Sequence, residues 1–356
     1  MTTGALLLNF GGPQRKEELE PFLANLLSDV LPLPRPLARV AGQQLAKLRA
    51  RKVQANYEHI GWSPLVPETQ QQMDAIRHQL GDSAPPMAMG MMFSEPTIDH
   101  ALRELERAGV TRLVVLGLFP HYSFATSGSA YEMVHEALGR LGLKHWPVHY
   151  RRPFFDQPAY LSALADTVRE TVASLDGEGP IHLLFSAHGI PVSFLKNGDP
   201  YPSQVEASVR GTVQALEWTH GWSLAWQSRL GPIRWLTPDT PHEIDRLAAL
   251  GVRRLILIPV SFVGEHIETL DEMDLEYVVQ ARERGIPHVG RAPALGTTPG
   301  FIQAMANEVA DAMTRFEAYS CMRCALPKPD AHRRQKQCPN CAFSFPDFLR
   351  HGRHRT

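Results

Sequence analysis

The segment MGMMFSEPTIDHALRELERAGVTRLVVLGLFPHYS at 89–123 has a second version, IRWLTPDTPHEIDRLAALGVRRLILIPVSFVGEH, at 233–266. Each version starts with an apolar segment that we expect to be a strand. A Pro and a Thr, an amphipathic helix, a Gly-Val turn and a second apolar strand follow in the same order. Two further pairs keep this order, 4–13 with 180–191 and 145–168 with 289–309. The chain is therefore predicted to be an internal duplication.

The short apolar runs Leu113–Leu118 and Leu255–Val260 are typical of strands that helices cover on both faces. Strands alternating with helices in this way form parallel, doubly wound sheets. We therefore predict an α/β protein with two Rossmann-like domains related by the duplication, followed by a small four-cysteine tail. The length of 356 residues fits two domains. The predicted boundaries are 1–150, 151–320 and 321–356.

Composition argues against several classes of protein. The 36 Lys and Arg residues nearly balance the 37 Asp and Glu residues, so a nucleic-acid partner is not expected. The N-terminal segment lacks the basic region of a signal peptide, and the longest apolar run, 255–264, is about half as long as a membrane span. All four cysteines follow residue 320, so no disulfide joins the preceding residues. We expect a cytoplasmic protein, and the oligomeric state stays open.

His188 lies where a doubly wound sheet presents its ligand-binding residues, at the carboxyl end of a strand. It follows the apolar run Ile181–Phe185, within the sequence Ser186–Pro191. A histidine at such a turn can be an ordinary structural residue. A neutral imidazole there can also accept a proton or bind a metal ion near pH 7, which makes His188 a candidate site residue.

Glu268, Glu272 and Glu276 follow the equivalent strand end with a spacing of four residues. If a helix begins near Glu268, this spacing places the three carboxylates on one face. They are either a solvated helix face, on which like charges repel slightly, or an acidic track that attracts a divalent cation and accepts protons.

Aromatic residues also gather at predicted strand and loop ends. Singly, each is an ordinary core residue. Together with a histidine and a cluster of carboxylates, they suggest a pocket for a large flat apolar ligand whose centre meets a metal ion or a proton acceptor. The residues are Phe10, Trp62, Phe119, Tyr122 and Trp235.

Several motifs together carry a family resemblance. They are LLLNFGGP at 6–13, SPL at 63–65, FPHYSFATSGS at 119–129, FSAHGIP at 185–191, WQSRLGP at 226–232 and EHIETLDEMDLEY at 265–277. In these motifs the chain resembles the ferrochelatases, lyases that insert Fe²⁺ into a porphyrin during haem biosynthesis. The resemblance covers about residues 4–316. It implies two Rossmann-like domains with the porphyrin held between them.

The resemblance also implies roles for individual residues. His188 matches the active-site histidine and Glu268 the carboxylate that faces it, so both are expected to be catalytic and to contact the Fe²⁺ substrate. Glu272 and Glu276 match the acidic ladder behind Glu268. Three aromatic residues match substrate-binding positions, namely Phe10, Tyr122 and Trp235.

The substrate expected from the resemblance is protoporphyrin IX, giving protohaem, because Asn9-Phe10-Gly11-Gly12 looks more like family members that use this porphyrin. Two alternatives from the same class stay open, a coproporphyrin III ferrochelatase and another tetrapyrrole metal chelatase. An alternative of a different class is a non-catalytic haem-binding protein. Against it, a carrier needs an axial ligand but no acidic ladder.

The tail carries Cys321, Cys324, Cys338 and Cys341 as two C-x-x-C knuckles. Four thiols at this spacing indicate a bound metal. Two symmetric knuckles favour one structural Zn²⁺. Some ferrochelatases carry a [2Fe-2S] cluster near this end of the chain, and four thiolates suit such a cluster too.

Residues Leu31–Lys52 suggest a peripheral membrane contact. Leu37, Val40, Ala41, Leu45 and Leu48 form one helical stripe, a pattern typical of an interfacial helix. The basic residues Arg39, Lys47, Arg49, Arg51 and Lys52 lie elsewhere on the helix. The alternative is a helix that packs this stripe against its own domain. The family resemblance implies an apolar lip at the porphyrin entrance.

Overall fold

The structure, a computed structural model, describes residues 1–31, 33–229, 231 and 233–316. The chain divides into two compact units. Of the described residues, unit 1 contains Met1–Leu118, Ser123–Pro153 and 305–316, and unit 2 contains Phe119–Tyr122 and Phe154–Ala304. The four cysteines lie outside the described residues.

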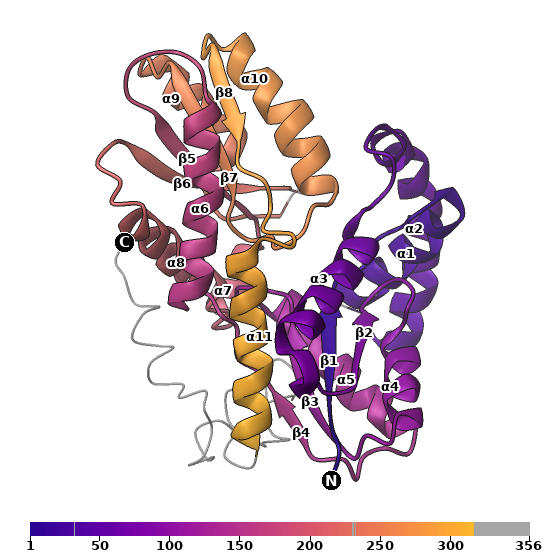
Figure 1. Ribbon diagram of the computed structural model, residues 1–356. Coiled ribbons are helices and arrows are strands. Elements are labelled where there is room, and N and C mark those ends of the chain that lie inside the picture. Colours follow the sequence, from indigo (N-terminus) through magenta and orange to yellow (C-terminus); the bar gives the residue numbers. More distant parts are fainter. Residues whose placement is uncertain (32, 230, 232, 317–356) are drawn as a thin grey trace. The chain divides into compact units, whose positions relative to one another are not determined.

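Unit 1 contains a four-stranded parallel sheet in the order β2-β1-β3-β4 (Figure 1). The strands are β1 (Thr3–Asn9), β2 (Met87–Met91), β3 (Arg112–Gly117) and β4 (Val148–Tyr150). The helices are α1 (Lys16–Val30), α2 (Arg35–His59), α3 (Leu65–Leu80), α4 (Ile98–Arg107) and α5 (Ser129–Arg140), with a 3₁₀ turn η1 (Gly81–Ser83) and a π-helical turn η2 (Phe124–Gly128). The central strand β1 is buried along its whole length, as expected for a sheet covered on both faces.

Unit 2 contains a second four-stranded parallel sheet, in the order β6-β5-β7-β8. The strands are β5 (His182–His188), β6 (Trp222–Gln227), β7 (Arg254–Pro259) and β8 (His288–Arg291). The helices are α6 (Pro158–Ser174), α7 (Val192–Lys196), α8 (Tyr201–Ala215), α9 (Thr240–Ala249), a π-helix η3 (Glu268–Tyr277) that continues into α10 (Val278–Glu283), and the start of α11 (Pro299–Thr314).

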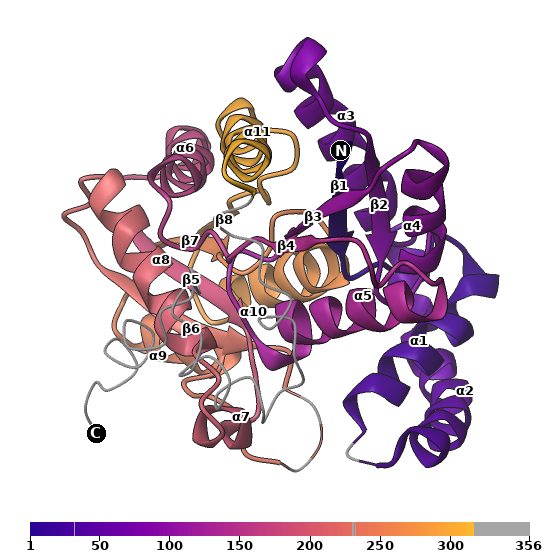
Figure 2. The same cartoon turned by 90° about the horizontal axis from the view of Figure 1, so that it is seen from below.

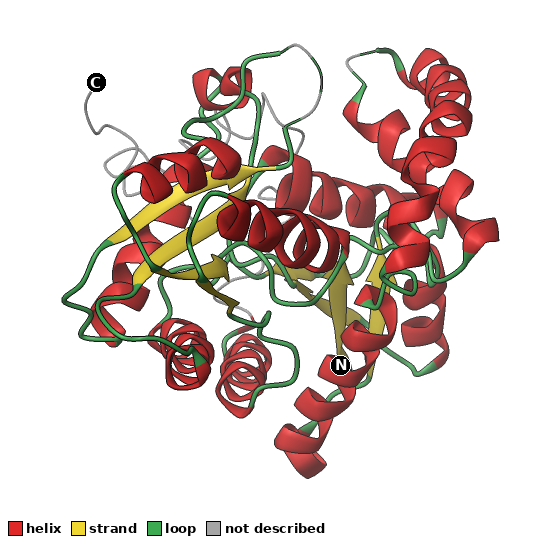
Figure 3. Cartoon of the chain, turned by 90° about the horizontal axis from the view of Figure 1, so that it is seen from above, coloured by secondary structure: helices red, strands yellow, loops and turns green. Residues whose placement is uncertain are grey.

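Helices cover both faces of the unit 2 sheet (Figures 2 and 3). On one face, α9, η3 and α10 enclose a core with side chains of β5 and β7. On the other face, α6 contacts Gly290 of β8, and α8 packs beside α6. None of the described helices has the length and apolar character needed to cross a membrane.

The two units confirm the predicted α/β fold with repeated topology. Strands β2, β1, β3 and β4 correspond in order and direction to β6, β5, β7 and β8. The entries to α4 and α9 also correspond, because Thr97 accepts a hydrogen bond from the His100 amide at 3.2 Å and Asp239 accepts one from the His242 amide at 3.0 Å. Each helix is followed by a glycine with positive φ, 76° at Gly109 and 77° at Gly251.

One strand assignment from the sequence is wrong. The repeat predicts that residues 233–236 match β2, but they contain only an isolated bridge between Pro191 and Trp235. The true counterpart of β2 is β6. Near the end of β6 the Trp226 amide donates to the Pro238 carbonyl, as the Met91 amide at the end of β2 donates to the Pro96 carbonyl. The second copy has a longer connection between strand and helix, and the apolar residues of that connection imitate a strand.

The units are not contiguous in sequence. The chain enters unit 2 for Phe119–Tyr122, and α11 belongs to unit 2 as far as Ala304 and to unit 1 beyond it. In unit 1, the buried Arg151 donates to Glu308 and, at 2.9 Å, to Asp311, so the end of α11 is fastened to the end of β4. The domain boundaries 1–150, 151–320 and 321–356 stay predictions.

Candidate active site

His188 is the last residue of β5, the central strand that pairs with both β6 and β7. The next residue, Gly189, still bonds to β6, because its amide donates to the Gln227 carbonyl at 2.9 Å. A Cβ on Gly189 would lie 2.8 Å from that carbonyl oxygen, so only glycine fits. The imidazole meets the Phe262 ring edge-on, with ring centroids 6.3 Å apart.

The electrostatic surroundings keep His188 neutral. Burial lowers the pKa of His188, and the nearby Glu268 carboxylate offsets only part of this effect. At pH 7 the ring therefore has a free lone pair, which is the form that accepts a proton or binds a cation.

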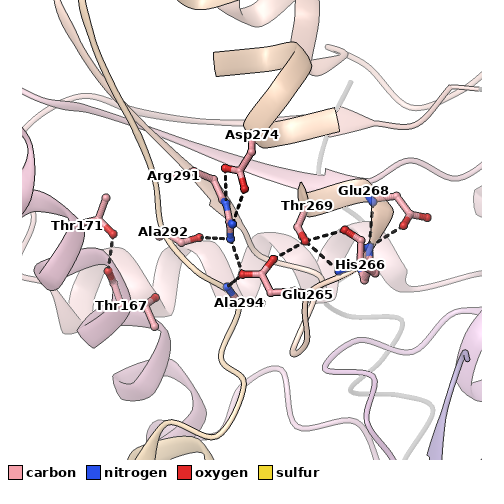
Figure 4. Close-up of polar contacts among 10 residues, drawn as sticks. All are labelled: Thr167, Thr171, Glu265, His266, Glu268, Thr269, Asp274, Arg291, Ala292 and Ala294. Carbon is pink, nitrogen blue, oxygen red and sulfur yellow. Dashed lines mark hydrogen bonds and ion pairs between the residues drawn. The ribbon is translucent and has the colours of Figure 1, made fainter. Parts of the chain in front are cut away.

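His266 and Glu268 form a close pair at the start of η3 (Figure 4). His266 Nδ1 lies 2.6 Å from Glu268 Oε2 and 3.1 Å from the Glu268 amide nitrogen. The His266 ring also packs on Phe262, with centroids 4.1 Å apart. Burial alone would raise the pKa of Glu268, but the charge and hydrogen bond of His266, with a smaller contribution from His188, lower it to about 2. Glu268 is therefore a carboxylate throughout the physiological range.

The helix predicted near Glu268 is confirmed and starts at that residue, but it is a π-helix. In a π-helix the hydrogen bonds run from i to i+5, so a spacing of four falls just short of one turn instead of just beyond it. Glu268, Glu272 and Glu276 still follow one side of η3. Single π-helical segments occur frequently at functional sites.

Glu272 sits in a pocket of hydrogen-bond donors. Its Oε2 accepts from Gln227 Nε2 at 3.1 Å, Ser228 Oγ at 2.7 Å and the Tyr277 hydroxyl at 3.3 Å. Burial and the negative charge of Glu268 nevertheless raise the pKa of Glu272 to about 7. Burial, followed by Asp271, also raises the pKa of Glu276, which lies at the exposed end of the row.

This gradient of pKa values has a chemical consequence. Glu268 stays ionised beside the neutral His188, whereas Glu272 exchanges its proton near neutral pH. Groups whose pKa values are driven apart in this way are typical of acid–base sites. Glu272 can therefore take up or release a proton near neutral pH, while Glu268 keeps its negative charge.

Gln227 fixes the orientation of this row. Its side-chain oxygen accepts from Ser186 Oγ at 2.7 Å, while its amide nitrogen donates to the Glu268 carbonyl at 2.9 Å and to Glu272. Both the oxygen and the nitrogen of the Gln227 side-chain amide are thus hydrogen-bonded. The side chain links the end of β6 to the first turn of η3.

The structure places the other predicted residues as follows. A Cβ on Gly189 would lie 3.5 Å from the Trp235 ring, so Trp235 is beside the strand end that carries His188. The backbone of Tyr122 is held in unit 2, because its amide donates to Gln204 Oε1 at 2.7 Å. Phe10 lies in unit 1, where its ring contacts Phe93 at 4.8 Å between centroids.

Sequence reasoning did not select several residues that the structure brings to this site. His266 lies inside the motif at 265–277, and Gln227 and Ser228 lie inside the motif at 226–232, so motif membership was a usable signal for all three. Phe262 carried no comparable signal. Within the described part of the chain, no three His, Cys, Asp or Glu side chains already surround a metal-sized position.

The fold and the row of carboxylates define a doubly wound α/β protein with ionisable groups at its strand ends. Two solved structures share the fold: SirB from Bacillus subtilis with Fe³⁺, at a TM-score of 0.55 and 14% identity, and the sirohydrochlorin chelatase SirB from Bacillus subtilis subspecies spizizenii in complex with cobalt, at 0.52 and 13%. Each comparison covers 90% of this chain and 99% of the other.

Sequence comparison identifies the family. The ferrochelatase family model matches residues 2–313. Ferrochelatase from Synechocystis sp. is 39% identical over 87% of this chain and 82% of its own length, and that from Geobacter metallireducens is 40% identical over 86% and 97%. The chain belongs to the ferrochelatase family, and it is an enzyme that inserts a metal into a porphyrin.

Proposed function

We propose that this enzyme inserts Fe²⁺ into protoporphyrin IX, with His188 and Glu268 as its catalytic residues. The observation that carries the proposal is the proximity of a neutral imidazole to a carboxylate that stays ionised, backed by Glu272 with a pKa of about 7. Metallation releases two protons from the pyrrole nitrogens as Fe²⁺ enters. Such a site needs proton acceptors that are unprotonated at neutral pH.

Each group has one role in this proposal. His188 accepts a pyrrole proton on its free ring nitrogen. Glu268 attracts the Fe²⁺ substrate, and Glu272 and Glu276 carry protons away along η3. Phe10, Tyr122 and Trp235 contact the porphyrin, which is held distorted so that its nitrogens face the metal. The distortion is offset by contacts over the rest of the ring.

The choice of protoporphyrin IX rests on Phe10, which packs against Phe93 and Phe22 in unit 1. The test offers Fe²⁺ to purified protein under anaerobic conditions, with protoporphyrin IX or coproporphyrin III. We expect the absorption spectrum to show faster metallation of protoporphyrin IX. Faster metallation of coproporphyrin III would transfer the assignment to that porphyrin, and binding of haem without metallation of either would indicate a carrier.

We further propose that α2 contacts an anionic membrane surface from the cytoplasm. Leu37, Leu45 and Leu48 are 59%, 43% and 62% exposed, and this exposure supports the proposal over the alternative in which the stripe packs against its own unit. Small residues face α1 instead, and a Cβ on Gly42 would meet the Ser28 amide nitrogen at 2.9 Å. The basic residues of α2 complement anionic headgroups.

Substituting Glu for Leu37, Leu45 and Leu48 together should lower binding to anionic liposomes by at least about tenfold, because each leucine contributes roughly 1.5–3 kcal/mol when fully buried. Thermal stability should change little, since these side chains are already exposed. Leu250→Glu is the matched control, because Leu250 is 68% exposed in unit 2. A large fall in melting temperature with unchanged liposome binding would show that the stripe is core.

We also propose that Cys321, Cys324, Cys338 and Cys341 hold one structural Zn²⁺. The family match ends at residue 313, before the first of these cysteines. Anaerobically purified full-length protein should be colourless and contain one zinc per chain. Cys338→Ser should lose the zinc and keep chelatase activity. Visible charge-transfer bands with two irons and labile sulfide would instead establish a [2Fe-2S] cluster, and absence of any bound metal would exclude both.

A further inference from the structure

Arg291, the last residue of β8, joins two carboxylates that lie on either side of the start of η3 (Figure 4). Its Nε and Nη2 donate to the two oxygens of Asp274 at 2.8 and 2.6 Å, which is the bidentate geometry that a guanidinium forms with a carboxylate. Its Nη1 donates to Glu265 Oε1 at 2.6 Å. The Arg291 side chain is only 11% exposed. It therefore connects the middle of η3 to the residue directly before His266.

Glu265 and Thr269 extend this connection to the backbone of His266. Glu265 Oε1 also accepts from the Ala294 amide at 2.9 Å, and its other oxygen accepts from Thr269 Oγ1. Thr269 is fully buried, and its Oγ1 accepts from the His266 amide at 3.1 Å. Figure 4 shows Thr269 between the Arg291 cluster and the pair of His266 and Glu268.

The charges explain why an arginine is needed at this place. Residues 265–276 contain six acidic residues and no Lys or Arg. Burial would raise the pKa of Glu265, but Arg291 and the surrounding donors lower it, so this carboxylate stays ionised. Arg291 thus compensates Glu265 and Asp274, whereas Glu268 pairs with His266. The cation steadies the segment without directly contacting the carboxylate proposed to attract Fe²⁺.

We propose that Arg291, Glu265 and Thr269 are positioning residues for metallation, forming a brace that holds the His266 backbone and the first turn of η3 so that Glu268 faces the reacting centre. This inference rests on the proposed role of Glu268. The brace acts through geometry: a catalytic group displaced by about 1 Å can lose on the order of a hundredfold in rate.

The first test compares Arg291→Met with Arg254→Met. Arg254 is the matched control, because it lies at the opposite end of the same sheet and its guanidinium donates to the carbonyls of Leu175, Asp176 and Gly179 at 2.7–3.0 Å. We expect Arg291→Met to lower kcat by about 10- to 100-fold, with the KM for porphyrin and for Fe²⁺ within about twofold of wild type. Arg254→Met should lower the melting temperature but keep kcat. Equal losses of kcat in the two variants, or a change confined to KM, would overturn the proposal.

Conservative variants separate geometry from fold stability. Arg291→Lys keeps the charge but cannot form the fork to both carboxylates, so its kcat should lie between wild type and Arg291→Met. Glu265→Gln can still accept from Arg291 and Ala294, and the Thr269 hydroxyl can turn to accept from the new amide. It should therefore recover most of the kcat that Glu265→Ala loses. If Glu265→Gln is as impaired as Glu265→Ala, hydrogen-bond geometry is not what the brace supplies, and the proposal fails.

Failure of the brace and failure of the proposed site give different results. If Glu268→Gln retains full activity, the site assignment itself fails, whatever Arg291→Met does. If Glu268→Gln is inactive and Arg291→Met keeps the wild-type kcat, only the brace is refuted.

Discussion

Replacing His188 with alanine should lower kcat for metallation by on the order of 10²- to 10⁴-fold, the usual contribution of a positioned proton acceptor. Porphyrin affinity should change little, because the imidazole provides a small part of the contact area of a macrocycle. The lowered pKa of His188 keeps its ring unprotonated at pH 7, so the residue is already in the accepting form. Steady-state kinetics and porphyrin fluorescence quenching measure the two quantities separately.

His182→Ala is the matched control for this experiment. His182 begins the same strand β5, its Nε2 lies 3.0 Å from Ser223 Oγ, and burial also lowers its pKa. It is at the amino end of the strand, away from the carboxyl end that carries the site. We expect His182→Ala to retain activity. Near-normal turnover in His188→Ala would remove His188 from the mechanism.

Glu268→Gln should lower kcat by about 10²-fold or more, because it removes a charge that is present at every physiological pH and that we propose to lie nearest the reacting centre. The amide keeps the size of the side chain and can still contact His266. The comparison variant is Glu272→Gln. It should be less impaired, because Glu272 lies four residues further along η3. Equal and mild losses in both variants would favour the interpretation of a solvated helix face.

We expect Glu268 and Glu272 to affect the pH dependence of stability in opposite directions. The pKa of Glu272 rises from 4.5 to about 7 in the folded protein, so its contribution to the free energy of unfolding is present below pH 4.5 and is lost as pH increases toward 7. The pKa of Glu268 falls from 4.5 to about 2, so its contribution is present above pH 4.5 and is lost as pH decreases toward 2. As pH increases from 5 to 8, the free energy of unfolding of Glu272→Gln should therefore increase relative to that of the wild type. Chemical denaturation at several pH values measures this difference, and a gap that is independent of pH would contradict it.

Much of the fold could be predicted because the apolar pattern of a buried parallel strand depends on the strand alone. The runs that form β3 and β7 are recognisable in this way, and the repeated order of strand, helix and Gly-Val turn indicates the duplication. The same rule fails at 233–236, since a connection that packs its apolar residues without pairing has the same local pattern as a strand.

The sequence by itself determined the fold class, the duplicated topology and the candidate residues at the strand ends, because each depends on local periodicity or on a short motif. Only the tertiary structure decided that η3 is a π-helix, that His266 pairs with Glu268, and that Gln227 and Ser228 surround Glu272. The separation of the Glu268 and Glu272 pKa values was likewise invisible in the sequence, where both are glutamates on one periodic row. Their protonation depends on burial and on hydrogen-bonding partners from β6 and from the loop after β7. These partners come from distant segments of the chain, and tertiary packing, not spacing along the sequence, brings them together.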